Sequence, residues 1–177
     1  MTLTKRSSKG SALSYDEMDG NFTHLGGDGS FHNAGVRVGP PGTILEMLAG
    51  HADGRTLVGH SGSYTLQNVT THQDLTSTHT SIGLDIDYIP PTGTKTVLYE
   101  AQFQFRGMDA DPLLHFQAIW DGNILEPSKS TFRVNAANDI QNLYHLSVAI
   151  ELNSSNVSVT NARIGAWTTA KTLSWTA

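Results

Sequence analysis

The chain has 177 residues, and its 11 lysines and arginines against 16 aspartates and glutamates give a formal net charge of −5. That length suits one domain with a sizeable core plus a small appendage. The negative balance disfavours nucleic-acid binding, which needs clustered cations, and electrostatic attachment to an anionic membrane. Only 15% of the residues are charged and none is cysteine, which is typical of an all-β surface and excludes disulfides and thiolate chemistry. We therefore expect stability to come from the core or from association of identical copies.

The first 25 residues are predicted to form a short arm and one helix. Residues 1–13 are small, polar and basic, and neither they nor any later stretch has the apolar run of a signal peptide or membrane span, so we expect a soluble product made in the cytoplasm. Ser14 and Glu17 have the spacing of a capping box, which marks a helix start. The helix should end at Gly26-Gly27 and is too short to persist alone in water. Its apolar residues are therefore expected to dock on a partner: Leu13, Met18, Phe22 and Leu25.

A linker is predicted next, and a β-rich body after it. Residues 26–41 are rich in glycine and end in Pro40-Pro41, which is the composition of a flexible connection. The predicted organisation is thus an arm and helix at 1–25, a linker at 26–41 and a β-sandwich domain at 42–177. Within the domain, we expect an apolar strand at Gly42–Leu48, a loop at 49–63 and an alternating strand at 64–69.

The stretch 80–105 is predicted to be the hairpin around which the domain is built. Apolar residues at 82, 84, 86 and 88 alternate with Gly83, Asp85 and Asp87, which is the period of a half-buried strand. Pro90–Gly93 then stops the strand, because proline cannot donate to a ladder. A second alternating strand follows at Val97–Phe105. We predict that these two strands pair and begin an antiparallel sheet.

Further alternating segments continue to the end of the chain. Leu114–Trp120 is followed by Asp121-Gly122-Asn123, which is a tight hairpin signal. Tyr144–Leu152 alternates again, and shorter apolar runs lie at 157–159, 164–167 and 173–175. About eight or more short strands at even spacing, with no second helical pattern, predict a mainly β fold. We expect an antiparallel β-sandwich, jelly-roll-like, with a short N-terminal arm and helix.

Three acidic residues are the strongest chemical candidate in the body. Asp85 and Asp87 lie two apart on one strand face, and Glu100 is expected on the neighbouring strand. Such a group could cleave a glycosidic bond as paired carboxylates or hold calcium. A polar sheet face in water is the commoner explanation, and we favour it. Asp109 and Asp111, in the loop that follows, are an equally weak signal for calcium or sugar.

No motif of a catalytic or metal centre is recognisable in the sequence. The eight histidines include no H-E-x-x-H arrangement, although His72 and His79, or His51 and His60, could meet across a loop. The chain also has no G-x-S-x-G, P-loop or dinucleotide fingerprint. We therefore expect no enzyme and no cofactor, and assign no catalytic, cofactor-binding or metal-binding residue.

The three tryptophans have a structural and a functional interpretation. They could line a carbohydrate-binding face by stacking on sugar rings. In a small β-domain, however, tryptophans more often anchor the core or a subunit contact, and we favour that interpretation. The residues concerned are Trp120, Trp167 and Trp175.

The opening string resembles a motif of tailed-bacteriophage virion proteins, tail-fibre-like ones above all. Residues 9–25, K-G-S-A-L-S-Y-D-E-M-D-G-N-F-T-H-L, fit the pattern K-G-S-x-L-(T/S)-x-x-E-(M/L)-D-x-N-F-x-x-L. The body is similar to a second phage and marine-virus pattern at Gly42–Glu46, Tyr64–Thr70, Thr78–Tyr99 and Trp167–Leu173. Domains with that pattern form the globular β-structured ends of fibre-like or decoration proteins, commonly as homotrimers.

The resemblance implies a non-enzymatic structural protein of a tailed phage particle, made in the host cytoplasm and located in the virion. In the leading interpretation, residues 1–25 attach a fibre-type surface protein to other structural proteins of the tail or capsid. Its homotrimeric β-domain would then project for host attachment. A surface glycan or receptor of the host would meet loops such as Arg106–Pro112, with Asp109 and Asp111, or Asn135–Asn142.

Two other functions remain open from the sequence. A capsid decoration or cement protein would use the same trimer to brace the head, and the small size of the chain favours that job. A carbohydrate-binding or glycan-cleaving protein, from a different class, would use the face with Asp85, Asp87 and Glu100 together with the tryptophans.

Overall fold

The computed structural model describes Ala12 and residues 32–33, 36–37, 42–71, 76–106, 113–133 and 141–177, with backbone only at 32–33, 36–37, 105–106 and 141–142. The chain divides into two units, Met1–Leu45 and Glu46–Ala177. In the first, β1 (His32–Asn33) pairs antiparallel with β2 (Val36–Arg37), inside the segment predicted as a linker. The predicted helix and its docking residues, Leu13, Met18, Phe22 and Leu25, lie outside the described residues.

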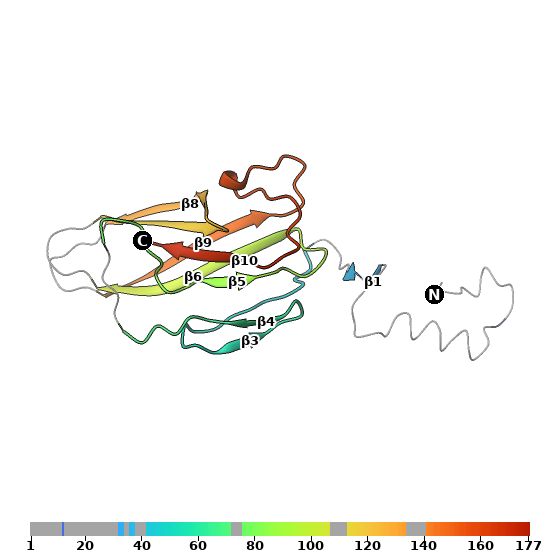
Figure 1. Cartoon of the computed structure of the whole chain (residues 1–177), viewed down its shortest axis with the longest axis horizontal. Helices are drawn as coiled ribbons and strands as arrows, with labels where there is room; N and C mark the ends of the chain where they lie inside the picture. Colours follow the sequence, from blue (N-terminus) through green and yellow to red (C-terminus); the bar gives the residue numbers. More distant parts are fainter. Residues whose placement is uncertain are drawn as a thin grey trace. The chain divides into compact units, whose positions relative to one another are not determined.

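The second unit is built from antiparallel strands, as predicted. A four-stranded sheet has the order β5-β10-β7-β8, a two-stranded sheet pairs β6 with β9, and a small hairpin pairs β3 with β4 (Figure 1). The strands are β3 (Thr56–Val58), β4 (Ser63–Thr65), β5 (Ile86–Tyr88), β6 (Thr96–Arg106), β7 (Leu113–Trp120), β8 (Asn123–Arg133), β9 (Gln141–Glu151) and β10 (Lys171–Thr176). One 3-10 turn, η2 (Val159–Asn161), follows β9. The mainly β, sandwich-like class expected from the sequence is confirmed.

The core lies between the four-stranded and the two-stranded sheet. Alternate residues of β9 are buried from Tyr144 to Ile150, and they face buried residues of β7 and β10. Aromatic rings join the two sheets, because Trp175 of β10 stacks on Tyr99 of β6 with ring centroids 5.8 Å apart. The period-two pattern that predicted these strands is therefore the pattern of their burial.

The predicted pairing of the central hairpin is wrong. β5 pairs with β10 and β6 pairs with β9, so the two strands belong to different sheets. The turn between them, with Pro90 and Pro91 buried and the Thr94 N–H donating to Pro91 O at 3.1 Å, carries the chain from one layer to the other. Alternation determines which face of a strand is buried but not which strand lies beside it, and both strands bury their apolar faces in the same core.

The β7–β8 hairpin is confirmed at the predicted turn. Trp120 pairs with Asn123, and the two residues between them, Asp121 and Gly122, have φ of 48° and 79°. Two positive φ values in a two-residue loop define a type I′ turn, whose twist matches that of the flanking strands. The local sequence is therefore sufficient to determine this connection.

A bulge interrupts the same hairpin further along. The register shifts between Phe116 and Ala118, where β8 contains Pro127, which has no N–H to donate. The buried Ser128 hydroxyl replaces the lost ladder bonds, because it accepts from the Ala118 N–H at 2.7 Å and donates to Leu125 O at 2.5 Å. The Ala118 N–H and the Leu125 carbonyl are therefore both hydrogen-bonded at this buried irregularity.

Three shorter predictions do not match the structure. Gly42–Leu48 is not a strand, and Ile44 and Met47 there are 77% and 80% exposed. The loop expected at 49–63 contains β3 and the first residue of β4. Of the short apolar runs near the end only 173–175 lies in a strand, β10. A few apolar residues in a row do not identify a strand, because the available partner decides whether such a run pairs.

Candidate functional site

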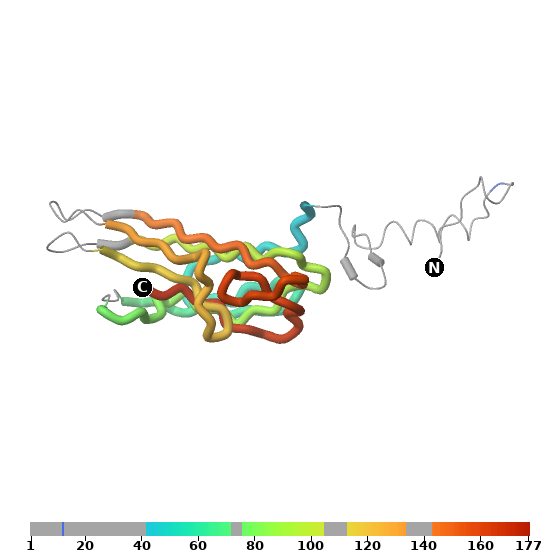
Figure 2. Tube along the Cα trace, turned by 90° about the horizontal axis from the view of Figure 1, so that it is seen from above, coloured from blue at the N-terminus to red at the C-terminus, as the bar shows by residue number. Residues whose placement is uncertain are grey.

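Four strand ends meet at the same end of the sandwich. Arg106, at the end of β6, pairs with Gln141 at the start of β9, and Leu113, at the start of β7, pairs with Arg133 at the end of β8. Aromatic side chains of all four strands pack together near this end, and in Figure 2 the coloured parts of these strands finish at the same end of the β-domain. The two predicted receptor-facing segments therefore begin and end at one site, which we call the loop end.

Little of the predicted receptor surface itself belongs to the described part of the chain. Arg106 is described by its backbone alone, and Asp109 and Asp111 lie outside the described residues, as does 134–140. What the structure does describe is the rim from which these segments start. Their contribution to binding stays a prediction.

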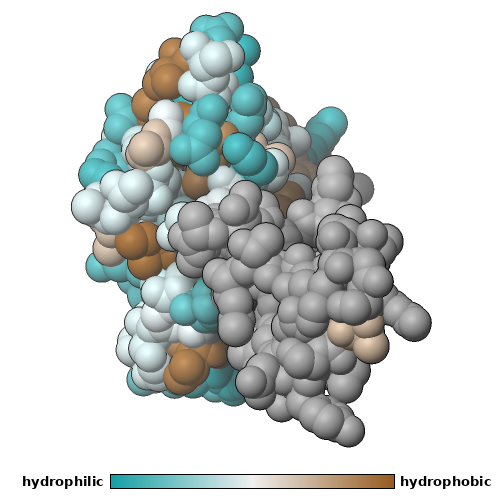
Figure 3. All heavy atoms as spheres, turned by 90° about the vertical axis from the view of Figure 1, so that its right-hand side faces the viewer, coloured by the Kyte–Doolittle hydropathy of each residue, from teal (hydrophilic) through white to brown (hydrophobic). Residues whose placement is uncertain are grey.

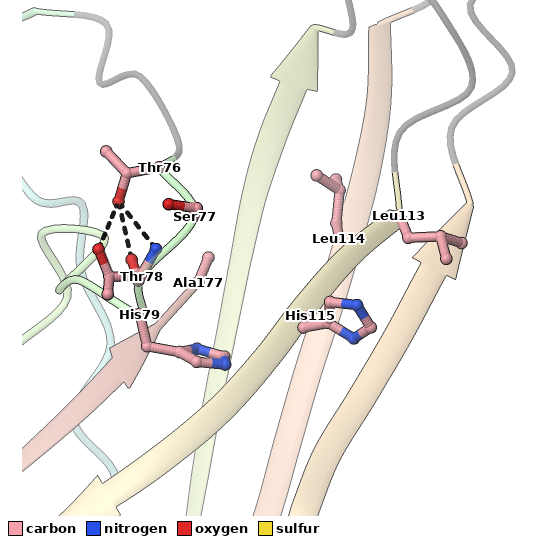
Figure 4. Close-up of a pocket in the computed structure, with 8 residues that line it drawn as sticks. All are labelled: Thr76, Ser77, Thr78, His79, Leu113, Leu114, His115 and Ala177. Atoms are coloured by element: carbon pink, nitrogen blue, oxygen red, sulfur yellow. Dashed lines mark hydrogen bonds between the residues drawn. The ribbon is translucent and has the colours of Figure 1, made fainter.

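A pocket of about 170 Å³ lies at the loop end. The segment 76–79 lines one side and the start of β7 at residues 113–115 lines the other, with Ala177 between them (Figure 4). In that view the His79 ring points across the pocket toward β7. The ring of His115 is held by a 2.9 Å hydrogen bond between its Nδ1 and Thr131 Oγ1. Hydroxyls, imidazoles and an apolar ledge at Leu113, which is 59% exposed, thus meet in one small concavity.

The three predicted carboxylates do not form a cluster. Asp85 and Asp87 bond to hydroxyls on the outer face of the four-stranded sheet, where Asp87 Oδ1 accepts from Thr172 Oγ1 at 2.5 Å. Glu100 lies on the exposed face of β6, in the other sheet, and its Oε1 is 3.2 Å from Nε2 of His145. Because the two outer faces point away from each other, the glycosidase and calcium interpretations of this trio are wrong.

The hydrogen bonds of Asp85 give it a structural role, which agrees with the favoured interpretation of these carboxylates as part of a polar sheet face. One of its oxygens accepts from Ser81 Oγ at 2.7 Å and also from Ser174 Oγ of β10. The other accepts from Gln67 Nε2 at 3.2 Å, while the Asp85 N–H donates to Gln67 Oε1 at 2.8 Å. This carboxylate therefore ties the segment before β5 to β10 and to the segment after β4.

A second polar network, centred on Glu46, was not predicted. Its Oε1 accepts from Ser61 Oγ at 2.6 Å and from Tyr88 OH at 3.0 Å, and its Oε2 accepts from the Ser61 N–H at 2.8 Å. Gly59 leaves the room that this carboxylate needs, because a Cβ there would lie 2.4 Å from Oε2. Burial, and then the hydrogen bond to Glu46, raises the pKa of the Tyr88 hydroxyl. No spacing in the sequence connects position 46 with position 88.

The tryptophans anchor the core, as the favoured interpretation predicts. Trp120, Trp167 and Trp175 are 8%, 5% and 0% exposed. Trp120 and Trp167 meet edge to face with ring centroids 5.5 Å apart. Side chains buried to this degree cannot present a flat face to a sugar ring.

The histidines do not assemble a recognisable metal centre in the described part of the chain. No group of three or more histidine, aspartate or glutamate side chains there could hold an ion. His72 lies outside the described residues, so its meeting with His79 stays a prediction. His145 pairs with Glu100, and His115 with Thr131.

Comparisons with protein-family models, with curated proteins and with solved structures found no match. Among the described residues, no helix is long and apolar enough to cross a membrane. Seen from the right of Figure 1, hydrophobic side chains appear on the visible surface as separate small groups (Figure 3).

Proposed function

We propose that this chain is a fibre-type structural protein of a tailed phage particle, attached by its N-terminal segment and projecting its β-domain for host attachment. The opening string at 9–25 suggested this class. The difference between the two ends of the β-domain supports it, and this difference is the observation on which the proposal depends. The domain starts at Glu46, which bonds to Tyr88 at the end of β5, just before the turn that leads into β6. The loop end, in contrast, lies where β6 finishes.

The distance between these two ends suits a projecting domain. β6 has 11 residues, and at about 3.3 Å per residue an extended strand of that length spans about 35 Å. A domain anchored at its start would therefore present the loop end away from its attachment point. Loops at such an exposed end are free to vary in sequence without disturbing the core, which is where recognition usually resides.

A trimer is the assembly that we propose for this domain. Among the described residues, the sheet of β6 and β9 is two strands wide, and its outer face has large exposed apolar side chains at Leu98, which is 59% exposed, and Leu143, which is 71% exposed. Self-association would cover these side chains and the strand edges, which are otherwise a liability for aggregation. A decoration protein on the head would have the same architecture, and the location on the particle separates these two functions.

The carbohydrate-cleaving alternative has lost the residues that suggested it. Its carboxylates lie on opposite outer faces, and its tryptophans are buried. We therefore do not retain it beside the fibre-type proposal. Sugar binding by the loops is still part of host attachment as proposed here.

The mass of the protein in solution tests the assembly. Light scattering on the full chain and on residues 42–177 should give three times the chain mass for both, because the β-domain is proposed to associate by itself. A monomer in both samples would contradict the proposal. A trimer of the full chain alone would move the contact to the N-terminal segment.

Incorporation into particles tests the attachment. A chain lacking residues 1–25 should fold and trimerise but fail to join particles assembled in infected cells, whereas the full chain should be present and be located at the tail by immunogold microscopy. Labelling on the head would replace the fibre assignment by the decoration one. Normal incorporation of the shortened chain would refute the anchor.

A further inference from the structure

The ladder between β6 and β9 uses every second residue of each strand. The Leu152 N–H donates to Lys95 O at 2.8 Å, so the odd-numbered residues of β6 turn their backbone groups toward β9. Glu151, the residue before, instead donates its N–H to Ala162 O and accepts from the Ile164 N–H, both at 2.8 Å. The backbone groups of the alternate residues therefore point away from the ladder, to the two edges of the sheet. In the middle of the strands these residues are Leu98, Glu100 and Gln102 on β6, and His145, Ser147 and Ala149 on β9.

Both edges are open along this middle stretch. Within the described part of the chain, no hydrogen bond joins the backbone of these residues to another segment, and all of them are exposed. Because unpaired backbone groups nearly always contact water, both edges face solvent in a single copy of the domain. Open edges of this kind promote association with other strands, and proteins usually cover them.

The two edges are complementary in direction. β6 and β9 run antiparallel, so the β6 edge of one copy can lie beside the β9 edge of another and continue the antiparallel order. A rotation about an axis parallel to the strands relates such copies, and it leaves the loop ends of all copies on the same side. Pairing of β6 with β6 would need a twofold axis across the strands, which places the loop ends on opposite sides. The first arrangement suits a domain that projects one end.

The cross-section of the sandwich suits the same rotation. Among the described residues, one layer has two strands and the other has four. Strands lie about 4.8 Å apart within a layer, and the layers lie about 10 Å apart. The sandwich is therefore narrower on the β6–β9 side, as a sector of a ring is narrower toward its axis. Copies arranged with this side inward have room for the wider layer at the larger radius.

We propose that the free edge of β6 in each copy pairs with the free edge of β9 in the next copy, so that three two-stranded sheets close into one six-stranded barrel on the threefold axis. This inference rests on the trimer of the proposed function and names its contact. Each contact joins two different edges, and contacts of that type form a closed ring when the rotation closes. A closed barrel has no free edge, so the association covers both open edges of every copy.

The outer-face side chains of β6 and β9 fill the interior of this barrel. In the ladder of a single copy, Leu98 lies opposite Ala149 and Glu100 lies opposite Ser147. Such alternation of large and small side chains fills small barrels. A buried charge without a partner would be costly there. Glu100 has a partner, because its Oε1 is 3.2 Å from Nε2 of His145 in the same copy.

Charge selects the register between copies. Ladder hydrogen bonding allows registers that differ by two residues, since alternate residues point to the edge. Among the outward residues of β9 named above, His145 is the one with a basic side chain. We therefore place Glu100 of one copy opposite His145 of the next, which is a pair of the kind that stabilises neighbouring strands. Compared with the ladder of a single copy, where Glu100 faces Ser147, this register is staggered by two residues, and barrel closure requires a stagger.

Amide hydrogen exchange of the full chain tests the edge contact residue by residue. In the trimer, the N–H groups of Leu98, Glu100 and Gln102 should exchange as slowly as those of Tyr99 and Ala101, which face β9. A contact made by the sheet faces alone would leave the three edge amides fast, at the rates of unpaired groups. Fast exchange of these amides in a protein with the mass of a trimer would overturn the edge pairing and leave the proposed function standing. A protein with the mass of a monomer would overturn both, so the two failures are distinguishable.

Proline and alanine at one edge position separate the backbone contact from the side-chain contact. Gln102→Pro removes an N–H that is unpaired within one copy, which an edge strand tolerates, but it should abolish the trimer in light scattering. Gln102→Ala keeps the N–H and should leave the trimer intact. Ser147→Pro makes the same test on the edge of β9, and circular dichroism reports whether each chain is folded. Retention of the trimer by folded proline variants, or its loss in the alanine variant, would contradict the edge pairing.

Mixed charge variants test the register. Glu100→Lys places a lysine opposite His145 of the next copy, and His145→Glu places two glutamates opposite each other, so each variant alone should form less trimer than the wild type. In an equimolar mixture the new lysine of one chain can face the new glutamate of the other, and trimers of mixed composition should form. Native mass spectrometry measures that composition. A mixture that forms no more trimer than its two components would overturn the proposed register.

Discussion

Hydrogen bonds of single side chains determine how the start of the β-domain is held. Glu46 joins Ser61, before β4, to Tyr88 at the end of β5, and the Ser61 hydroxyl continues to Tyr64 OH at 2.7 Å. Tyr64 in turn donates to Ile89 O at 2.9 Å. One carboxylate therefore connects three segments that are far apart in the sequence, and each of these contacts is partly buried, where hydrogen bonds are strongest.

Tyr88→Phe should lower the free energy of unfolding by about 1–2 kcal/mol at pH 7, because it removes a hydrogen bond to a carboxylate. The pKa of Tyr88 is raised in the folded chain, so the folded state keeps a proton that the unfolded state loses above about pH 10. The contribution of this hydroxyl is therefore fully present below about pH 10 and is lost as the pH rises further. Urea titrations at pH 7 and at pH 11 measure both effects.

The comparison of the two pH values makes the test specific. Burial, and then the charge of Asp85, also raises the pKa of Tyr99, so the variant should retain part of the loss of stability at high pH. It should nevertheless lose less stability than the wild type between pH 7 and pH 11. An equal loss in both proteins would contradict the assignment to Tyr88.

The β7–β8 hairpin shows how one element is determined by a few local positions. Its turn requires positive φ at two successive residues, and its bulge requires a hydroxyl at Ser128 beside Pro127. Between them the strands position Phe116 and Trp120 in the core.

Gly122→Ala should destabilise the domain by about 1 kcal/mol. The φ of Gly122 is 79°, a conformation that side chains disfavour, and a Cβ there would meet nothing within 4 Å. The cost is therefore one of backbone conformation alone. Gly165→Ala is the matched control, because its Cβ would lie 3.7 Å from Val157 in ordinary contact and the backbone is not strained. Thermal unfolding of both variants should show a loss for the first and none for the second.

At the scale of the whole molecule, the β-domain has two different ends and one outer face on which large apolar side chains are exposed. Polar networks bind the start of the domain, and the loop end has the pocket and the bases of two loops. The outer face of β6 and β9 lies between these ends and has Leu98 and Leu143 exposed. If the proposed trimer forms, this face is the surface that we expect to meet another copy.

Leu143→Glu should convert the proposed trimer into a monomer without unfolding the chain, since it would place a charge in each apolar contact. Val157→Glu is the control, because Val157 is 57% exposed but lies after β9, outside this sheet. Light scattering reports the mass, and circular dichroism reports the fold. Retention of the trimer by the first variant would exclude this face as the contact.

The strands were predictable where a local pattern was sufficient. Alternation at Tyr144–Ile150 and at Leu114–Trp120 predicted strands whose inward residues are buried, because a pleated backbone sends successive side chains to opposite faces. The turn at Asp121-Gly122 was predictable because few residues tolerate positive φ. The burial of the tryptophans agreed with the usual role of large aromatics in a small β-domain.

Partners in space were not predictable, because alternation is the same whichever strand lies alongside. That is why β5 and β6 were expected to pair, and why Glu100 was expected beside Asp85. The Glu46 network joins position 46 to positions 61 and 88, which are 15 and 42 residues away in the chain, and neither composition nor spacing gives a signal for these contacts. The sequence by itself determined the class of fold, the faces of the main strands and the β7–β8 turn, since these depend on neighbouring residues. Only the tertiary structure decided which strands share a sheet and which carboxylates are structural, because those follow from packing between distant segments.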